Sequence, residues 1–121
     1  MTNKETLRAE IGDKEFMLRN TSLTDWDDYD FTLRTLRDAY EDLVDELEPT
    51  EKAGTISSLL ERLETCDDDV ATIMIQKAMD DYGFRPNEHG EMFTPEQVAS
   101  REPSANAFVL DLVDSWVDVL R

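Results

Sequence analysis

Four aspartates lie close together near residue 25 of this 121-residue chain. Asp25, Asp27, Asp28 and Asp30 could offer several carboxylate oxygens to a hard cation such as calcium. Their spacing does not match an EF-hand loop, which needs Gly at its sixth position and Glu at its twelfth, because these positions hold Asp30 and Leu36 when counted from Asp25. We therefore interpret the cluster as a helix start, where the helix dipole favours carboxylates.

The other residues capable of chemistry stand apart from one another. The run Asp67 to Asp69 is typical of a capped helix start, and His89 and Cys66 are the single histidine and cysteine. This excludes zinc spacing and an intramolecular disulfide. The four glycines are too far apart to form a phosphate-binding loop. We expect no catalytic residues, no cofactor and no metal, and thus a protein that is not an enzyme.

The net charge of −17 lies entirely after residue 20, because residues 1–20 carry four basic and four acidic side chains. Such an excess disfavours direct contact with nucleic acid or with anionic membranes. Two explanations fit it. A salt-filled cytoplasm makes dense carboxylates tolerable through strong screening, as in halophilic adaptation. Alternatively, the carboxylates imitate nucleic-acid phosphates and occupy the basic groove of another protein.

Alternating apolar residues at the N-terminus predict a β-hairpin over about residues 5–19. Gly12 and Asp13 would form its two-residue type II′ turn, since Gly accepts the positive φ that this turn requires. One face of the hairpin would collect five apolar side chains: Leu7, Ala9, Ile11, Phe16 and Leu18. An isolated hairpin is marginal in water, so we expect this face to pack on the rest of the chain.

A long helix is predicted from Thr24, as N-cap, to about Leu47, with Pro49 ending it. Aromatic and apolar groups recur in it at spacings of three and four: Trp26, Tyr29, Leu33, Leu36, Tyr40, Leu43 and Leu47. This stripe is typical of a core-facing helix or of a seam for a partner helix. We favour the core, because the chain offers little other aromatic bulk.

Further helices are expected after a loop through Gly54: one over 55–65, an antiparallel neighbour starting at 67–69 and stopping near Gly83, and two more beginning at Thr94 and Pro103. A turn-rich segment over 84–93 separates the two pairs. The predicted fold is α+β and predominantly α, a single domain over 1–121 with the hairpin packed on a bundle of four to five helices over about 24–121. No apolar run approaches the roughly 20 residues that span a bilayer. With its lone cysteine, the chain is expected in the cytoplasm.

The layout resembles that of the tail assembly chaperones of tailed viruses. The resemblance is carried by the segment from Ala9 to Arg19, by Leu23-Thr24 at a long helix start, by the segment from Phe93 to Val98, and by a final helix from Phe108 to Leu120. It implies a non-enzymatic factor in the host-cell cytoplasm that shields the helix-forming tape measure protein during tail assembly.

Contacts with such a partner are expected through apolar residues that the helical core leaves exposed, ringed by acids. We assign them to the hairpin and the first helix turn: Leu7, Ile11, Phe16, Leu18, Trp26 and Tyr29. The alternative hypothesis is an acidic inhibitor that mimics DNA and blocks a nucleic-acid-binding defence protein. Self-association of the chain is left open.

Overall fold

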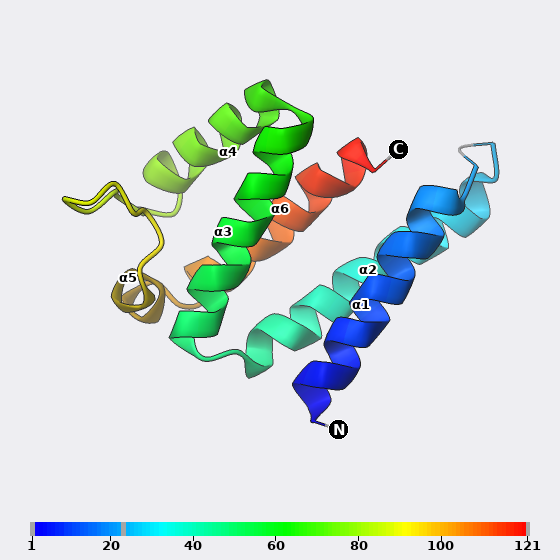
Figure 1. The fold of residues 1–121 in the computed structure, drawn as a ribbon, viewed down its shortest axis with the longest axis horizontal. Helices are drawn as coiled ribbons and strands as arrows, with labels where there is room; N and C mark the ends of the chain where they lie inside the picture. The colour runs from blue at the N-terminus through cyan, green and yellow to red at the C-terminus, as the bar shows by residue number, and fades with distance from the viewer. Residues whose placement is uncertain (1, 23, 121) are drawn as a thin grey trace.

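The computed structural model describes residues 2–22 and 24–120, and these residues form helices and no strand (Figure 1). The helices are α1 (Asn3–Asn20), α2 (Trp26–Glu46), α3 (Pro49–Cys66), α4 (Asp68–Asp80), α5 (Pro95–Ser100) and α6 (Ser104–Val119). The predicted α+β fold class is therefore wrong for the described part of the chain, which is all-α.

The predicted hairpin over residues 5–19 is the helix α1. Leu7, Ile11 and Leu18 are four and seven residues apart, a spacing that places them on one helical face, and the predicted hairpin would also have placed them on one face of its two strands. Ile11 and Leu18 are buried and Leu7 is half-buried. Ala9 and Phe16, which the hairpin would have turned inward, are exposed. The short alternating pattern was thus ambiguous, and the helical period is the one realised.

Local interactions at its N-terminus also favour the helix. Thr2 and Glu5 form a capping box, in which Thr2 Oγ1 accepts from the Glu5 N–H and the Glu5 carboxylate accepts from the Thr2 N–H, both at 3.2 Å. Farther along, Glu10 and Lys14 form an i,i+4 ion pair at 3.7 Å. Gly12 does not turn the chain but continues the helix.

The long helix α2 confirms most of the predicted stripe. Tyr29, Leu36, Tyr40 and Leu43 are buried, with Leu47 buried just beyond the helix end and Leu33 partly buried. Trp26 is the exception, with 58% of its surface exposed. The helix begins after Asp25 and not after Thr24, and Asp25 makes no side-chain capping bond.

The segment after α2 corrects a second prediction. Pro49 does not only follow one helix but opens the next, since proline at the first helical position loses no hydrogen bond there. Glu48 and Glu51 form a capping box around it. The expected loop through Gly54 is therefore helical, and α3 begins six residues earlier than the predicted start at Thr55.

The later elements confirm their predicted boundaries closely. Asp67 caps α4 by accepting from the N–H groups of Asp69 and Val70, at 3.0 and 3.3 Å. Thr94 and Gln97 form the capping box of α5 around Pro95. The helix predicted from Pro103 is α6, and its apolar face is buried from Ala105 to Val117.

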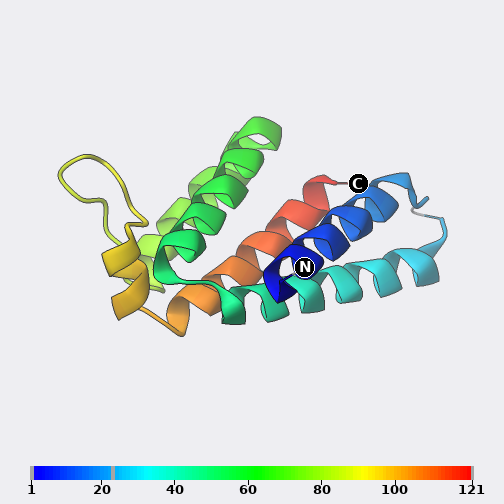
Figure 2. The same ribbon diagram turned by 60° about the horizontal axis from the view of Figure 1, so that its bottom comes forward.

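The helices form two antiparallel pairs joined by α6 (Figures 1 and 2). Helix α1 packs on α2, and α3 packs on α4 and α5, while α6 packs on α2, α3 and α4. The segment between α4 and α5 is held to α6 by aromatic rings, with Phe84 and Phe93 centred 5.8 and 5.7 Å from Phe108. None of the described helices combines the length and apolar composition needed to cross a bilayer.

Candidate binding groove between α1 and α3

The six residues predicted to contact a partner do not form one surface. Ile11, Leu18 and Tyr29 are buried in the core, whereas Phe16 and Trp26 are 69% and 58% exposed. Trp26 stacks against Tyr29, with ring centroids 6.0 Å apart. Of this set, Ile11 alone lines the groove described next.

A groove runs between α1 and α3. Helix α1 packs on α2 and α3 packs on α6, and α2 and α6 pack on each other. The first cavity of the groove measures about 450 Å³. Apolar and aromatic side chains from α1, α2 and α3 lie at its base: Ile11, Tyr40, Leu43 and Leu59. On the α3 wall, short residues at Gly54, Thr55 and Ser58 lie between the long side chains of Glu51 and Arg62, so the middle of this wall projects little into the space.

A second cavity of about 640 Å³ continues the groove toward the end of α3. The two cavities share Glu15, Ser58 and Arg62 as lining residues, so they are adjoining halves of one depression. Trp116 of α6 and the exposed Cys66 line the second half. The depression thus extends along most of α3.

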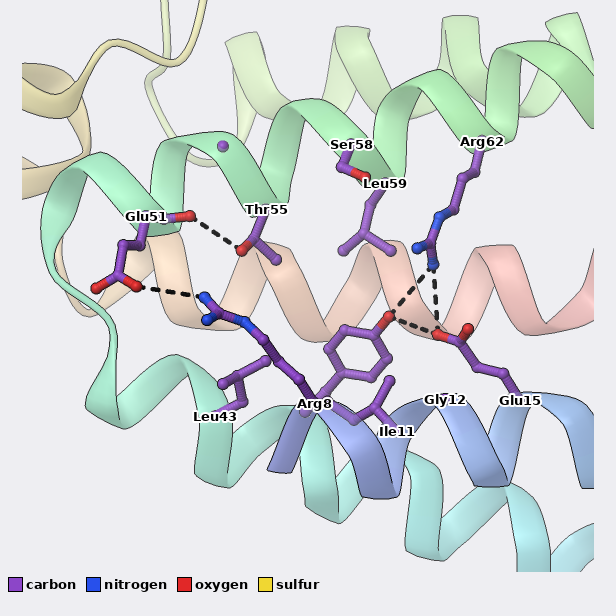
Figure 3. A pocket seen from close by; sticks show the side chains of 12 residues that line it. Arg8, Ile11, Gly12, Glu15, Leu43, Glu51, Thr55, Ser58, Leu59 and Arg62 are labelled. Carbon is purple, nitrogen blue, oxygen red and sulfur yellow. Dashed lines mark hydrogen bonds and ion pairs between the residues drawn. The ribbon is translucent and has the colours of Figure 1, made fainter. Parts of the chain in front are cut away.

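Ion pairs cross the groove from α1 to α3, as Figure 3 shows. At one end the Glu51 carboxylate accepts from Lys4 Nζ at 2.9 Å and from Arg8 Nη2 at 3.3 Å. The hydrogen bond from Lys4, followed by that from the backbone N–H of Glu48, lowers the pKa of Glu51 to about 2. Glu51 is therefore ionised throughout the physiological range.

A second crossing lies near the middle of the groove, where Arg62 Nη1 donates to Glu15 Oε1 at 3.3 Å. Tyr40 Oη donates to the same Glu15 oxygen at 2.8 Å. Burial, and then the negative charge of Glu15, raise the pKa of Tyr40 well above its usual value of 10.0. The guanidinium of Arg62 also lies 4.6 Å from the ring centroid of Trp116, a cation–π contact.

The protonation states of Tyr40 and Glu51 are fixed at neutral pH. Tyr40 is held protonated and Glu51 is held ionised, and each is shifted away from neutrality. The groove therefore presents fixed charges and a hydroxyl, which can position a bound group.

Two glycines line the groove without a conformational reason for being glycine. Gly12 and Gly54 lie inside α1 and α3, and the described positive-φ glycines are Gly83 and Gly90. A Cβ atom added at Gly12 or Gly54 would meet nothing within 4 Å. Because Gly inside a helix costs about 1 kcal/mol relative to Ala, both positions carry a cost that no internal contact explains.

The other clusters considered from the sequence lie outside the groove. Asp25 and Asp28 repel each other at the start of α2, and the charge of Asp25 raises the pKa of Asp28. Among residues 2–22 and 24–120, no group of three or more His, Cys, Asp or Glu side chains is arranged to hold a metal ion. His89 lies in a turn where its backbone N–H donates to Asn87 Oδ1 at 2.9 Å.

Comparisons with known proteins found no match to the chain. No family model matches the chain, and neither a characterised protein nor a solved structure is significantly similar to it.

The groove is not predicted from the sequence, because the hairpin expected over residues 5–19 leaves out α1, one of its two walls. Leu23, part of the resemblance, lies outside the described residues. A usable signal was present in Gly12 and Gly54, since an isolated Gly within a helical pattern points to a packing or functional reason.

Proposed function

We propose that the protein is a non-enzymatic binding protein whose α1–α3 groove receives a helical segment of a partner protein. The observation that carries this proposal is the continuous depression along α3, with an apolar base and short side chains on one wall. Amphipathic helices bind in this manner, by laying an apolar face into a hydrophobic groove.

The ion pairs across the groove are compatible with entry of a helix. The side chains of Arg8 and Arg62 are about half-exposed, that of Glu51 is 30% exposed and that of Glu15 is 15% exposed. Exposed ion pairs contribute about 0 to 1 kcal/mol each.

A chaperone role in the assembly of a viral tail fits this binding mode, because the tape measure protein is a helical client. The β-hairpin that carried part of the resemblance is a helix, so this role now rests on the groove and on the later helices. The acidic body of the chain would keep a complex with an apolar client soluble.

Co-expression tests the proposal. The chain is produced together with a tape measure protein of a tailed virus, and the soluble fraction of that protein is measured. We expect the unaltered chain to raise this fraction and the double variant Gly12→Leu and Gly54→Leu, which fills the groove, to lose the effect. Ala9→Leu adds the same side chain to an exposed position of α1 outside the groove lining and is the matched control.

Two results would count against the proposal at different levels. Equal solubilisation by the groove-filled variant would show that the groove is not the binding site. Absence of association at both low and high salt would remove the tail-assembly role.

A further inference from the structure

The charges along the groove identify the chemistry of its occupant. We infer that it is an amphipathic partner helix of about 15 residues, spanning the groove, whose net charge is near zero and whose flanks carry both acidic and basic side chains. This inference rests on the proposed function and adds the class of partner to it.

The length of the partner helix follows from the length of the groove along α3. The two cavities are lined from Glu51 to Cys66. At a rise of 1.5 Å per residue, this stretch is about 22 Å long. A straight partner helix lying along it therefore contacts the groove through about four turns.

The mixed charge follows from the lining residues. Arginines and glutamates line the two cavities in equal number: Arg8, Arg19, Arg62, Glu15, Glu51 and Glu61. An entering helix separates Arg8 from Glu51 and Arg62 from Glu15, so charges of both signs lose an ionic partner, although Glu51 keeps Lys4 at 2.9 Å and Glu15 keeps the Tyr40 hydroxyl at 2.8 Å. A flank of a single sign would satisfy half of them and repel the other half.

The low net charge of the partner helix is inferred from the charge of α1, which differs from that of the rest of the chain. Helix α1 carries four basic and four acidic side chains, whereas α2 carries two basic and eight acidic ones. The groove is thus bordered by a neutral helix within a chain of net charge −17. A second copy of the chain would bring another large negative charge to the same place, so we assign the groove to a different protein.

The glycines determine how closely the helix approaches. Gly12 stands on one wall and Gly54 on the other, and neither side chain position is filled from within the protein. Missing Cβ atoms allow a bound segment to come close to the backbone of both helices. A partner contact accounts for both costly glycines together.

Peptide binding tests the inference with the full chain. Three fluorescein-labelled 15-residue peptides share one Leu stripe at helical spacing, and their remaining positions carry Lys alone, equal Lys and Glu, or Glu alone. Fluorescence anisotropy measures the dissociation constant at low and at high sodium chloride concentration. The proteins are the unaltered chain, the double variant Gly12→Leu and Gly54→Leu, and the control Ala9→Leu.

We expect the neutral peptide to bind the unaltered chain with a dissociation constant that changes less than about threefold with salt, because no net charge is neutralised. Groove filling should weaken its binding at least about tenfold, as expected when roughly 1.4 kcal/mol of contact is lost, and Ala9→Leu should leave it unchanged. The Lys peptide should bind at low salt without dependence on the groove, through the overall acidity of the chain.

Other outcomes are separable. Tighter groove-dependent binding of the Lys or the Glu peptide at high salt would overturn the inferred charge and leave the proposed function standing. Failure of groove filling to weaken any peptide would overturn both. A concentration-dependent dimer in sedimentation that the double variant abolishes would identify a second copy as the occupant. Ser58→Phe provides a second groove-filling variant if circular dichroism shows the first to be unfolded.

Discussion

Replacing the two groove glycines by alanine should stabilise the protein. Gly12 and Gly54 are exposed interior positions of α1 and α3, and a Cβ at either place contacts nothing within 4 Å. Alanine in a helix interior is favoured over glycine by about 1 kcal/mol, chiefly because the unfolded chain loses freedom. The substitutions lie on different helices, so the double variant should gain about 2 kcal/mol.

Thermal unfolding followed by circular dichroism measures this gain. With an unfolding entropy of about 2.1 cal/mol/K per residue, 1 kcal/mol corresponds to about 4 °C for a chain of this length. We therefore expect a midpoint about 4 °C higher for each single variant and about 8 °C higher for the double variant. Urea unfolding should give the same free energies at unchanged slope.

Gly83→Ala is the control of opposite sign. Gly83 has φ +72°, and its added Cβ would collide with the guanidinium of Arg101. The left-handed backbone alone costs a side-chain-bearing residue about 1 to 2 kcal/mol, so this variant should be less stable. If Gly12→Ala or Gly54→Ala also lowers the midpoint, these glycines are required for internal packing, and the argument that a partner explains them is refuted.

Three further substitutions test the charged and hydrogen-bonded groups. The pKa of Glu51 is about 2 in the folded chain against 4.5 ordinarily. The stabilisation from its ionised carboxylate is therefore complete above about pH 4.5 and is lost as the pH falls toward 2. In urea unfolding, the free energy of unfolding of Glu51→Gln should fall less between pH 6 and pH 3 than that of the unaltered chain. Tyr40→Phe removes the hydrogen bond to Glu15 and should lower the free energy of unfolding at pH 7 by about 1 to 2 kcal/mol, whereas an unchanged urea midpoint would show that this bond adds nothing. Glu102→Gln removes the ionic partner, at 2.6 Å, of the Lys52 ammonium, whose side chain is 1% exposed. Because Glu102 itself is half-exposed, we expect thermal unfolding to show a decrease of about 1 to 2 kcal/mol in the free energy of unfolding. A smaller decrease for Asp30→Asn, which removes an exposed ion pair, would support burial of Lys52 as the reason.

Helix starts that are marked by capping residues were predictable from the sequence. Asp67 before α4 and the Thr94, Pro95 and Gln97 group before α5 act through bonds to neighbouring backbone groups. Such bonds form over two or three residues, and no distant contact is needed to decide them. The apolar stripe of α2 was also predictable, because its seven members repeat at helical spacing over about six turns and do not fit the period of a strand.

The N-terminal segment carried conflicting local signals, because the Thr2 and Glu5 capping box favours a helix whereas the apolar alternation favours a hairpin. Leu7, Ile11 and Leu18 fit both one face of a two-stranded hairpin and one face of a helix, and Gly12-Asp13 fits both a type II′ turn and a helix interior. The packing of α1 along α2 selects the helix, since it buries Ile11 and Leu18 together against one neighbour. Pro49 was ambiguous for a related reason, because proline can follow one helix and open another.

By itself, the sequence determined the balance of local forces: a net charge of −17 with a neutral first twenty residues, the caps, and the apolar stripes of α2 and α6. These depend on residues close together in the chain. Only the tertiary structure decided that the neutral segment stands as α1 across a groove from α3, with Gly12 and Gly54 lining the same cavity and Glu15 bonded to Arg62. Those pairs are more than 40 residues apart, and their proximity arises because α1 packs on α2 while α3 packs on α6.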